Sequence, residues 1–577
     1  MNQSARRTQP PATHRGAPGW CALGGGRWAP LVIASALLPL AAFPPLEWPA
    51  LAWVALVPLL LALRHGAGGP GAWAATGWLY GLVYWGVQYA WLHHAFVEQA
   101  GMGWLHFANF FALAVALLAL GLALALAAAR WAWLRWGLTP MATLPVLLAA
   151  QDAVLGAWPF GGLAWGSLAG PQAGTLAARA IVPVLGGAGL VLLLGGVNAA
   201  WAAWVARLRG GAPARGALGA AALGLLTALC AWPAPAAVQP AGVEPAATPG
   251  AALSVLLVPG DLSLAELQAG RDASGPLRHY LGRTLAALAA PAAPAAGTAQ
   301  PPATRSADAP RPTLVLWPES AVPGVLEPGV LEPGGRALGG RAPGGPLAEL
   351  AQVGALLGVD FLLGANARER ERETNALFLV RGATGEVARY DKRRLVPFGE
   401  YVPAGFGWLF PRKLTAGAED YAAGAGAPVL EWQGERLGLA ICFETMLPGA
   451  VREAVQAGAT VLVGAANDAW LTPAARRQHL QLTALRGLEA GRDVLFVANR
   501  GWSGLLRGGR ALALSPRAPL RVQAVPRRGR TPFVRWGAWP LAGPAALVLL
   551  AAAWWGRRVE APRPARSHNS TSATDER

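Results

Sequence analysis

The strongest constraint on this chain is a series of long apolar runs within its first 235 residues. A helix that crosses a bilayer needs about 20 mostly apolar residues, and the sequence meets that length repeatedly. We therefore expect a multi-span α-helical membrane bundle. Seven predicted spans precede residue 236, and an eighth follows a long, less apolar segment. The predicted spans lie near residues 28–45, 47–63, 72–95, 104–129, 139–159, 180–205, 217–234 and 535–555.

Positively charged residues predict the orientation of this bundle, because Arg and Lys accumulate at the cytoplasmic ends of membrane spans. They occur in the tail at 1–27, in alternate connections between the runs, and at 556–577. The basic residues in those connections are Arg64, Arg130, Arg135, Arg207, Arg209 and Arg215. Seven spans that begin in the cytoplasm place the chain after residue 236 on the opposite side of the membrane. Both tails are then cytoplasmic, and the first span is an uncleaved anchor, since six more spans follow it.

The composition argues against a nucleic-acid-binding protein and against a Cys-rich metal protein. Hydrophobic residues make up 54% of the chain and charged residues 14%, which is far from a soluble average. The formal charge of +17 comes from short basic clusters between apolar runs, so no nucleic acid partner is expected. Cys21, Cys230 and Cys442 are too few and too far apart for a disulfide framework or a zinc site built from cysteines.

The segment from residue 253 to 520 has a different pattern, in which short apolar runs alternate with amphipathic ones. The strand-like runs are LSVLLVPG, TLVLWPES, DFLLGAN, ALFLV, LGLAICFE, TVLVGAAN and DVLFVANRG. Helix candidates between them include PLAELAQVGALLG and HLQLTALRGLEAGR. Strands that alternate with helices indicate a layered α/β domain. The Pro- and Ala-rich residues 236–252 are expected to be a linker between the bundle and this domain.

Reactive side chains lie at the ends of strand-like runs in this domain. Glu319 ends LVLWPES, Cys442 lies near the end of LGLAICFE, and Lys392 with Glu400 lies in YDKRRLVPFGEYVP. A thiol becomes a nucleophile beside a base, a carboxylate can take its proton, and an ammonium can stabilise the oxyanion formed at an attacked carbonyl. Only two of the 48 basic residues are lysines, which favours a specific use of Lys392. A lone cysteine is more often a small buried hydrophobe, and these residues alone leave that alternative open.

Two features within the predicted spans are unusual. Tyr and Trp cluster in GWLYGLVYWGVQYAWLHH at 77–94, which favours anchoring at a lipid interface over a direct role with substrate. Gln151 and Asp152 form a polar pair inside the fifth apolar run. A polar pair at membrane depth indicates a functional site, whereas the same pair near a helix end needs no function.

Several motifs of the chain resemble those of the nitrilase-like, or carbon-nitrogen hydrolase, superfamily. They are WPES at 317–320, KRRLVPFGEYVP at 392–403 and ICFE at 441–444. Together with the membrane spans, they make the chain similar to the bacterial apolipoprotein N-acyltransferases over nearly all of its length. The segments PPLEWPALAWVALVPLLLAL at 44–63 and NDAW at 467–470 also resemble that family, although no single short motif carries the resemblance.

The resemblance implies a fold, a location and a reaction. The domain at 253–520 would be an extramembrane α-β-β-α sandwich that faces the periplasm from the bacterial inner membrane. The enzyme would transfer a fatty acyl chain from a membrane phospholipid to the N-terminal amine of a diacylglyceryl-cysteine apolipoprotein. The acyl chain would pass through a cysteine thioester, and no metal or organic cofactor is implied.

The resemblance also assigns site residues. Glu319 would be the general base, Lys392 the oxyanion-stabilising cation and Cys442 the nucleophile. The supporting residues, which would orient this triad or line the substrate entrance, are Glu400, Glu444, Asn375 and Trp470. Three of these residues also have a purely structural alternative. Glu444 would then hydrogen-bond the backbone near the site, Glu400 would cap a loop, and Trp470 would be an ordinary core residue.

Two other functions stay open at this point. A membrane-tethered amidase or nitrilase would hand the same thioester to water, and a catalytically silent scaffold would bind lipoproteins without acylating them. The sequence departs from the family pattern at Leu471, at Arg500 and at the pair Gln151 and Asp152. These departures concern substrate details and leave the three triad residues in place.

Overall fold

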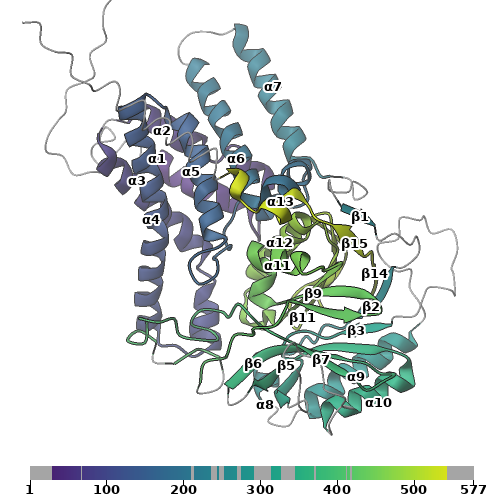
Figure 1. Cartoon of the computed structure of the whole chain (residues 1–577). Coiled ribbons are helices and arrows are strands. Elements are labelled where there is room, and N and C mark those ends of the chain that lie inside the picture. The colour runs from purple at the N-terminus through teal and green to yellow at the C-terminus, as the bar shows by residue number, and fades with distance from the viewer. Residues whose placement is uncertain are drawn as a thin grey trace, which may run out of the picture.

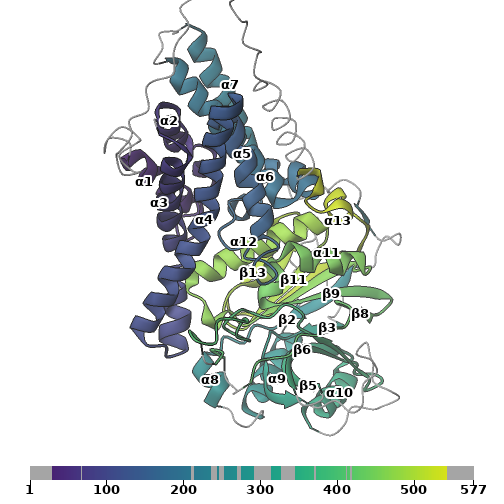
Figure 2. The same cartoon turned by 60° about the vertical axis from the view of Figure 1, so that its left-hand side comes forward.

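The computed structural model describes residues 29–66, 68–208, 214–234, 243–245, 252–269, 274–290, 313–326, 345–369, 372–410, 412–415 and 419–541. Helices from the N-terminal part of the chain form a bundle that packs against a sandwich of two β-sheets formed by the later part (Figure 1 and Figure 2). The predicted span at 535–555 lies largely outside the described residues.

All seven apolar runs predicted before residue 236 contain helix. The bundle elements are α1 (Ala29–Leu37), η2 (Leu38–Ala42), η3 (Pro49–Trp53), α2 (Val57–His65), α3 (Pro70–Gln88), η4 (His94–Gln99), α4 (Trp104–Trp136), α5 (Pro140–Leu155), η5 (Gly170–Gln172), α6 (Leu176–Leu208) and α7 (Ala214–Ala231). In the described part of the chain, only α4 and α6 are both long and apolar enough to cross a membrane, with mean hydropathies of 2.7 and 2.2. Prolines at 39 and 49 lie in the first two runs, where short 3-10 helices replace α-helix. An eight-span bundle therefore stays a prediction.

Helices α3 and α4 approach closely because small residues line their contact. A Cβ atom at Gly77 would lie 2.4 Å from the Leu122 carbonyl oxygen, and one at Gly81 would lie 2.7 Å from the Cα atom of Ala119. Glycine at these two positions lets the helix backbones pack together, as is common between membrane helices.

Four aromatic residues of the run at 77–94 face the inside of the bundle. Tyr80, Tyr84, Trp85 and Tyr89 are all buried, and the Tyr84 hydroxyl donates a hydrogen bond to a backbone carbonyl oxygen at 2.7 Å. The prediction that this run anchors the protein at a lipid interface is therefore wrong for these four residues, because they pack against other parts of the bundle.

The later part of the chain folds into two sheets whose strands follow the predicted apolar runs. The seven-stranded sheet has the order β14 (Leu520–Ala524), β2 (Leu253–Leu257), β3 (Leu314–Leu316), β5 (Asp360–Glu369), β6 (Arg372–Val380) and β7 (Val387–Asp391), with β4 (Val322–Leu326) paired to β5. The six-stranded sheet has the order β13 (Arg510–Ser515), β12 (Ser503–Arg507), β11 (Val494–Ala498), β10 (Val461–Ala466), β9 (Glu435–Ile441) and β8 (Val429–Trp432). Strands β2, β3 and β5 run parallel, as do β9, β10 and β11. The carboxyl ends of parallel strands meet at one edge of each sheet.

Alternate residues of the central strands face different cores. In β2, Val255 and Leu257 point between the two sheets, whereas Leu256 packs toward the outer helices. The outer helices are α9 (Ser274–Ala289) and α10 (Pro346–Leu357) on the seven-stranded sheet, and α11 (Pro448–Gln456) and α12 (Pro473–Ala490) on the six-stranded sheet. Because both faces of each sheet are buried, the strands are apolar along nearly their whole length. This order of layers confirms the predicted α-β-β-α sandwich.

Short elements at the edge of the sandwich complete the fold. The predicted linker at 236–252 contains a strand, β1 (Val243–Pro245), which pairs antiparallel with β15 (Arg527–Gly529). Helix α8 (Leu264–Ala269) follows β2, and α13 (Pro532–Trp536) packs against α6.

Helix α12 lies between the six-stranded sheet and the bundle helix α6 (Figure 2). Helix α6 bends at Gly186, where φ is 70°, and the backbone N–H of Gly187 donates to Glu489 Oε1 on α12 at 2.8 Å. Near the other end of α12, the Arg477 guanidinium donates two hydrogen bonds to the Glu47 carboxylate, at 2.9 Å and 2.8 Å. These contacts link the sandwich, which carries the strand ends described next, to the bundle.

Candidate active site

Three strand ends bring Glu319, Lys392 and Cys442 to one cavity. Glu319 lies between β3 and β4, Lys392 directly follows β7, and Cys442 directly follows β9. Strands β3 and β7 belong to one sheet and β9 to the other, so the site lies where the two sheets meet. All three side chains line the same cavity. The structure thus brings together the three residues that the resemblance assigned.

Lys392 is fully buried between two carboxylates. Its Nζ atom lies 2.9 Å from Glu400 Oε1 and 3.4 Å from Glu319 Oε1. Asn375 Nδ2 donates to the same two oxygens, at 2.9 Å and 2.7 Å respectively. The remaining oxygens accept backbone N–H groups at 2.7 Å, Glu319 Oε2 from Asn467 and Glu400 Oε2 from the residue four positions before it. Each carboxylate therefore has directional partners on both oxygens, which fix its orientation.

The charges of this cluster alter the protonation of Lys392 and Cys442. Burial opposes the positive charge of Lys392, but the carboxylates of Glu400 and Glu319 outweigh burial and raise its pKa. Burial raises the pKa of the Cys442 thiol well above its ordinary value, the Glu319 carboxylate raises it further, and Lys392 opposes both. At neutral pH the lysine is an ammonium and the cysteine is a neutral thiol, so the thiol needs a base before it can attack.

A sharp turn presents Cys442 at the start of the 3-10 helix η6 (Cys442–Met446). Its backbone φ is 51°, in the left-handed region that residues other than glycine rarely adopt. The buried Glu444 carboxylate ties this turn down, because it accepts the backbone N–H groups of Ile441 and Arg393, both at 2.9 Å. Glu444 therefore joins the strand that ends at the cysteine to the segment that carries the lysine. It also accepts a hydrogen bond from the Tyr390 hydroxyl at 2.9 Å.

Sequence reasoning missed a polar group behind Cys442. His479 on α12 lies with Nδ1 2.8 Å from Asp468 Oδ1 and with Nε2 2.8 Å from Thr445 Oγ1. Thr445 in turn donates to the Cys442 carbonyl oxygen at 2.8 Å. Asp468 belongs to the NDAW motif, which was a usable signal, and it lies in η7 (Asp468–Trp470). The sequence pattern contains no sign that His479 pairs with it.

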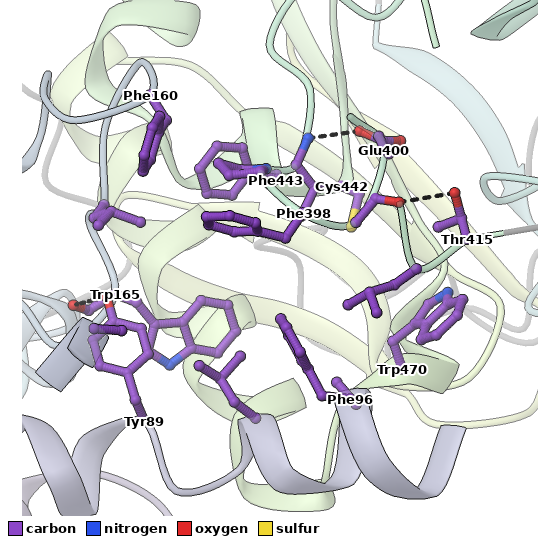
Figure 3. A pocket seen from close by; sticks show the side chains of 18 of the residues that line it. Tyr89, Phe96, Phe160, Trp165, Phe398, Glu400, Thr415, Cys442, Phe443 and Trp470 are labelled. Carbon is purple, nitrogen blue, oxygen red and sulfur yellow. Dashed lines mark hydrogen bonds between the residues drawn. The ribbon is translucent and has the colours of Figure 1, made fainter. Parts of the chain in front are cut away.

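The triad opens onto one large cavity between the sandwich and the bundle, with a volume of about 1230 Å³. Figure 3 shows aromatic rings along the pocket that contains Cys442, with Phe398 and Trp470 from the sandwich and Phe96 and Tyr89 from the bundle. Trp470, predicted to line the substrate entrance, lines this cavity. Ligand pockets usually measure about 300–1,000 Å³, so this cavity has room for a lipid-sized substrate. Among the residues that the structure describes, no three His, Cys, Asp or Glu side chains are grouped to hold a metal ion.

Two family models match the chain, and they divide it as the fold does. A model of the apolipoprotein N-acyltransferase N-terminal domain matches residues 35–200, and a carbon-nitrogen hydrolase model matches residues 279–528. An apolipoprotein N-acyltransferase from Azotobacter vinelandii is 33% identical over 552 residues, which cover 92% of this chain and 96% of that protein. The chain belongs to the apolipoprotein N-acyltransferase family. This finding confirms the resemblance seen in the motifs.

Shorter matches to other family members agree with this membership. The apolipoprotein N-acyltransferase of Pseudomonas paraeruginosa is 34% identical over 260 residues, covering 43% of this chain and 47% of that protein. The apolipoprotein N-acyltransferase of Ralstonia nicotianae is 36% identical over 215 residues, which cover 35% of this chain and 41% of that protein. The chain is therefore a membrane enzyme and an N-acyltransferase of lipoproteins, and the hydrolase and scaffold alternatives lose their support.

Proposed function

We propose that Cys442 takes a fatty acyl chain from a membrane phospholipid as a thioester and passes it to the N-terminal amine of a diacylglyceryl-cysteine apolipoprotein. The observation that carries this proposal is the position of Glu319, Lys392 and Cys442 on the wall of a cavity lined by apolar residues of the bundle. Apolar walls favour lipid chains and limit the water that would hydrolyse a thioester.

The first half-reaction moves the acyl chain to sulfur. Glu319 accepts the proton of the Cys442 thiol while the sulfur attacks the ester carbonyl carbon and the C–S bond forms. The carbonyl oxygen becomes an oxyanion, which the Lys392 ammonium stabilises. When the ester C–O bond breaks, Glu319 returns the proton to the leaving alcohol, which departs as a lysophospholipid.

The second half-reaction forms the amide. The neutral amine of the acceptor attacks the thioester carbonyl, and Lys392 again stabilises the oxyanion. The C–S bond then breaks, while Glu319 takes a proton from the nitrogen and passes it to the sulfur, which restores the thiol. In this scheme Glu400 and Asn375 hold the base and the cation in place.

The proposal includes an orientation of the enzyme in the bacterial inner membrane. The sandwich at 253–520 faces the periplasm, and the tails at 1–27 and 556–577 are cytoplasmic. The distribution of basic residues between the apolar runs supports this orientation. Both substrates are anchored in lipid, so a site beside the membrane can bind them without extracting them. Topology reporters fused after Ala246 and in the C-terminal tail should report opposite sides, and reports from the same side would contradict this orientation.

A donor phospholipid with a radioactive acyl chain separates the two half-reactions. Without acceptor, membranes that contain the enzyme should accumulate protein-bound label that neutral hydroxylamine releases, as expected for a thioester. Cys442→Ala should carry no label, and Glu319→Gln should acquire it slowly, because the thiol has lost its base. Addition of a diacylglyceryl peptide with a free amine should move the label into an amide. Label that persists in Cys442→Ala, or that leaves as free fatty acid as fast as the peptide removes it, would contradict the proposal.

A further inference from the structure

On the bundle side, helices α4 and α5 line the cavity that contains Cys442, and we call this part of the cavity the branch. On α4 the lining residues extend from Phe110 to Leu124, and the part between Phe110 and Gly121 is about 16 Å long at the rise of an α-helix. On α5 the lining includes Gln151, Val154 and Leu155. One monolayer contributes about half of the roughly 30 Å hydrocarbon core of a bilayer, so the branch is long enough for a fatty acyl chain.

The outer wall of this branch consists of apolar side chains that the protein leaves uncovered. Leu117 is 52% exposed, Leu124 is 70% exposed, and Val154 on the facing helix is 53% exposed. In a membrane bundle such residues face lipid chains. The branch is therefore continuous with the triad at one end and borders the lipid along its side, as a site for one acyl chain requires.

Gln151 interrupts the apolar lining. On α4 and α5, which are described over their full lengths, it is the one polar side chain that lines the cavity. Its Oε1 atom is buried and has no hydrogen-bond partner in the described part of the chain. Its Nε2 atom would lie 2.9 Å from a Cβ atom built on Gly121, so the carboxamide packs directly over that glycine on the facing helix. A buried, unpaired polar atom at membrane depth is costly. We therefore expect Gln151 to have a function beyond filling space between the helices.

We propose that Gln151 and Gly121 form the floor of an acyl-chain site and limit the length of the chain that the enzyme transfers. The inference rests on the proposed function, in which the carbonyl of the donor chain lies at Cys442 while its methyl end points into the branch. Each methylene buried among apolar side chains favours binding about fourfold. That gain ends where the chain meets the carboxamide.

Two substitutions on the floor are expected to act in opposite directions. Gln151→Ala removes the whole carboxamide and should shift the transferred chains toward longer ones, with a gain of up to about fourfold for each added methylene. Gly121→Ala pushes the carboxamide into the branch and should shift them toward shorter ones. Gly196→Ala on α6 is a matched control, because a Cβ atom there meets nothing within 4 Å. The profile is measured by mass spectrometry of lipoprotein N termini in membranes supplied with phospholipids of mixed chain length.

The ratio of long to short products within one sample does not depend on how much enzyme has folded, so poor folding of a variant cannot produce the expected shifts. Unchanged ratios in both Gln151→Ala and Gly121→Ala, with lipoproteins still acylated, would overturn the length limit and leave the proposed function standing. An equal shift in Gly196→Ala would also overturn it. Absence of thioester in the unsubstituted enzyme would contradict the proposed function itself.

Discussion

The active-site cluster buries two carboxylates beside one cation, and a second cluster, where α12 contacts α6, buries one carboxylate beside one cation. The two clusters differ in how many hydrogen bonds each carboxylate accepts. At the active site, Glu319 and Glu400 each accept three hydrogen bonds, from Lys392, from Asn375 and from a backbone N–H group. Both oxygens of each carboxylate therefore have a partner. The same carboxylates raise the pKa of Lys392, so its ammonium keeps its proton at neutral pH.

The cluster on α12 is less complete. Glu489 accepts one hydrogen bond, from the Gly187 N–H group, and its Oε2 atom makes none in the described structure, although the Arg486 guanidinium lies 3.2 Å away. Burial raises the pKa of Glu489 to about 7, because Arg486 and the backbone N–H offset burial only in part. The comparison indicates that the candidate active site surrounds its buried carboxylates with more hydrogen-bond donors than the α12 cluster does. In the α12 cluster, Glu489 titrates near neutral pH.

The largest expected effect comes from changing the active-site cation. In Lys392→Arg, a planar guanidinium replaces a compact ammonium between two carboxylates, and under the proposed mechanism it would no longer reach the developing oxyanion. We expect the rate of Cys442 acylation to fall about 10²–10³-fold, as when one oxyanion donor is lost. Single-turnover transfer from a labelled phospholipid measures this rate. Near-normal turnover would mean that the lysine does not face the reacting carbonyl.

The second expected effect concerns stability and distinguishes the two clusters by pH. Glu489 has a folded pKa of about 7 against an ordinary value of 4.5, so the folded state binds the proton more tightly than the unfolded state. The free energy of unfolding should therefore fall as pH rises from 4.5 to about 7 and stay constant above, with a total change of about 3 kcal/mol.

Thermal unfolding in detergent at pH 5 and at pH 8 checks this expectation, with Glu489→Gln as the matched variant. The substitution keeps the shape of the side chain and removes its titration, so the difference in the free energy of unfolding between pH 5 and pH 8 should shrink by most of this amount. An identical pH dependence in Glu489→Gln and in the unsubstituted enzyme would show that another group is responsible.

A smaller effect is expected from removing one hydrogen-bond donor, the Asn375 side chain, from the active site. Asn375→Leu removes two hydrogen bonds to the carboxylates of Glu319 and Glu400 while it keeps a similar volume. Hydrogen bonds to charged groups contribute about 1.5–3 kcal/mol, so we expect acylation to slow about tenfold to a hundredfold. The KM for the donor should change little, because the donor chain binds elsewhere in the cavity. A raised KM with an unchanged maximal rate would place Asn375 in substrate binding instead.

The smallest effect is expected at the partly exposed pair of Arg477 and Glu47. The Arg477 side chain is 39% exposed, so water screens the interaction despite its two hydrogen bonds. Arg477→Ala should lower the free energy of unfolding by less than about 1 kcal/mol and leave acylation unchanged. If the free energy of unfolding instead fell by about 3 kcal/mol, the change expected for Glu489, this pair rather than the packing of α12 would hold the sandwich to the bundle.

The sandwich was largely predictable because its strands are buried on both faces. LSVLLVPG contains β2 and LGLAICFE contains most of β9, and such short apolar runs between turn residues leave few alternatives to a strand. The positions of Glu319, Lys392 and Cys442 at strand ends could also be seen in the sequence. Their meeting at one cavity depends on how the two sheets stack, which only the resemblance suggested.

Other parts of the site could not be predicted, because they depend on contacts between distant elements. His479 supports Cys442 from a helix whose periodicity marks it only as buried. The cavity wall on α4 escaped prediction because this helix is apolar on all sides, so no periodic stripe distinguishes the face toward Cys442 from the face toward lipid. The strand β1 lay hidden in a Pro- and Ala-rich segment, since its partner β15 is nearly 300 residues away in sequence.

Tandem mass spectrometry of the peptide that contains Cys442 tests the covalent intermediate most directly. The enzyme is incubated with phospholipid but no acceptor, and the peptide is analysed before and after neutral hydroxylamine. We predict one fatty acyl group on Cys442 that hydroxylamine removes, none on Cys230, and a strongly reduced amount in Glu319→Gln. An acyl group on a different residue, or an unmodified Cys442 in enzyme that still acylates its acceptor at the normal rate, would contradict the thioester.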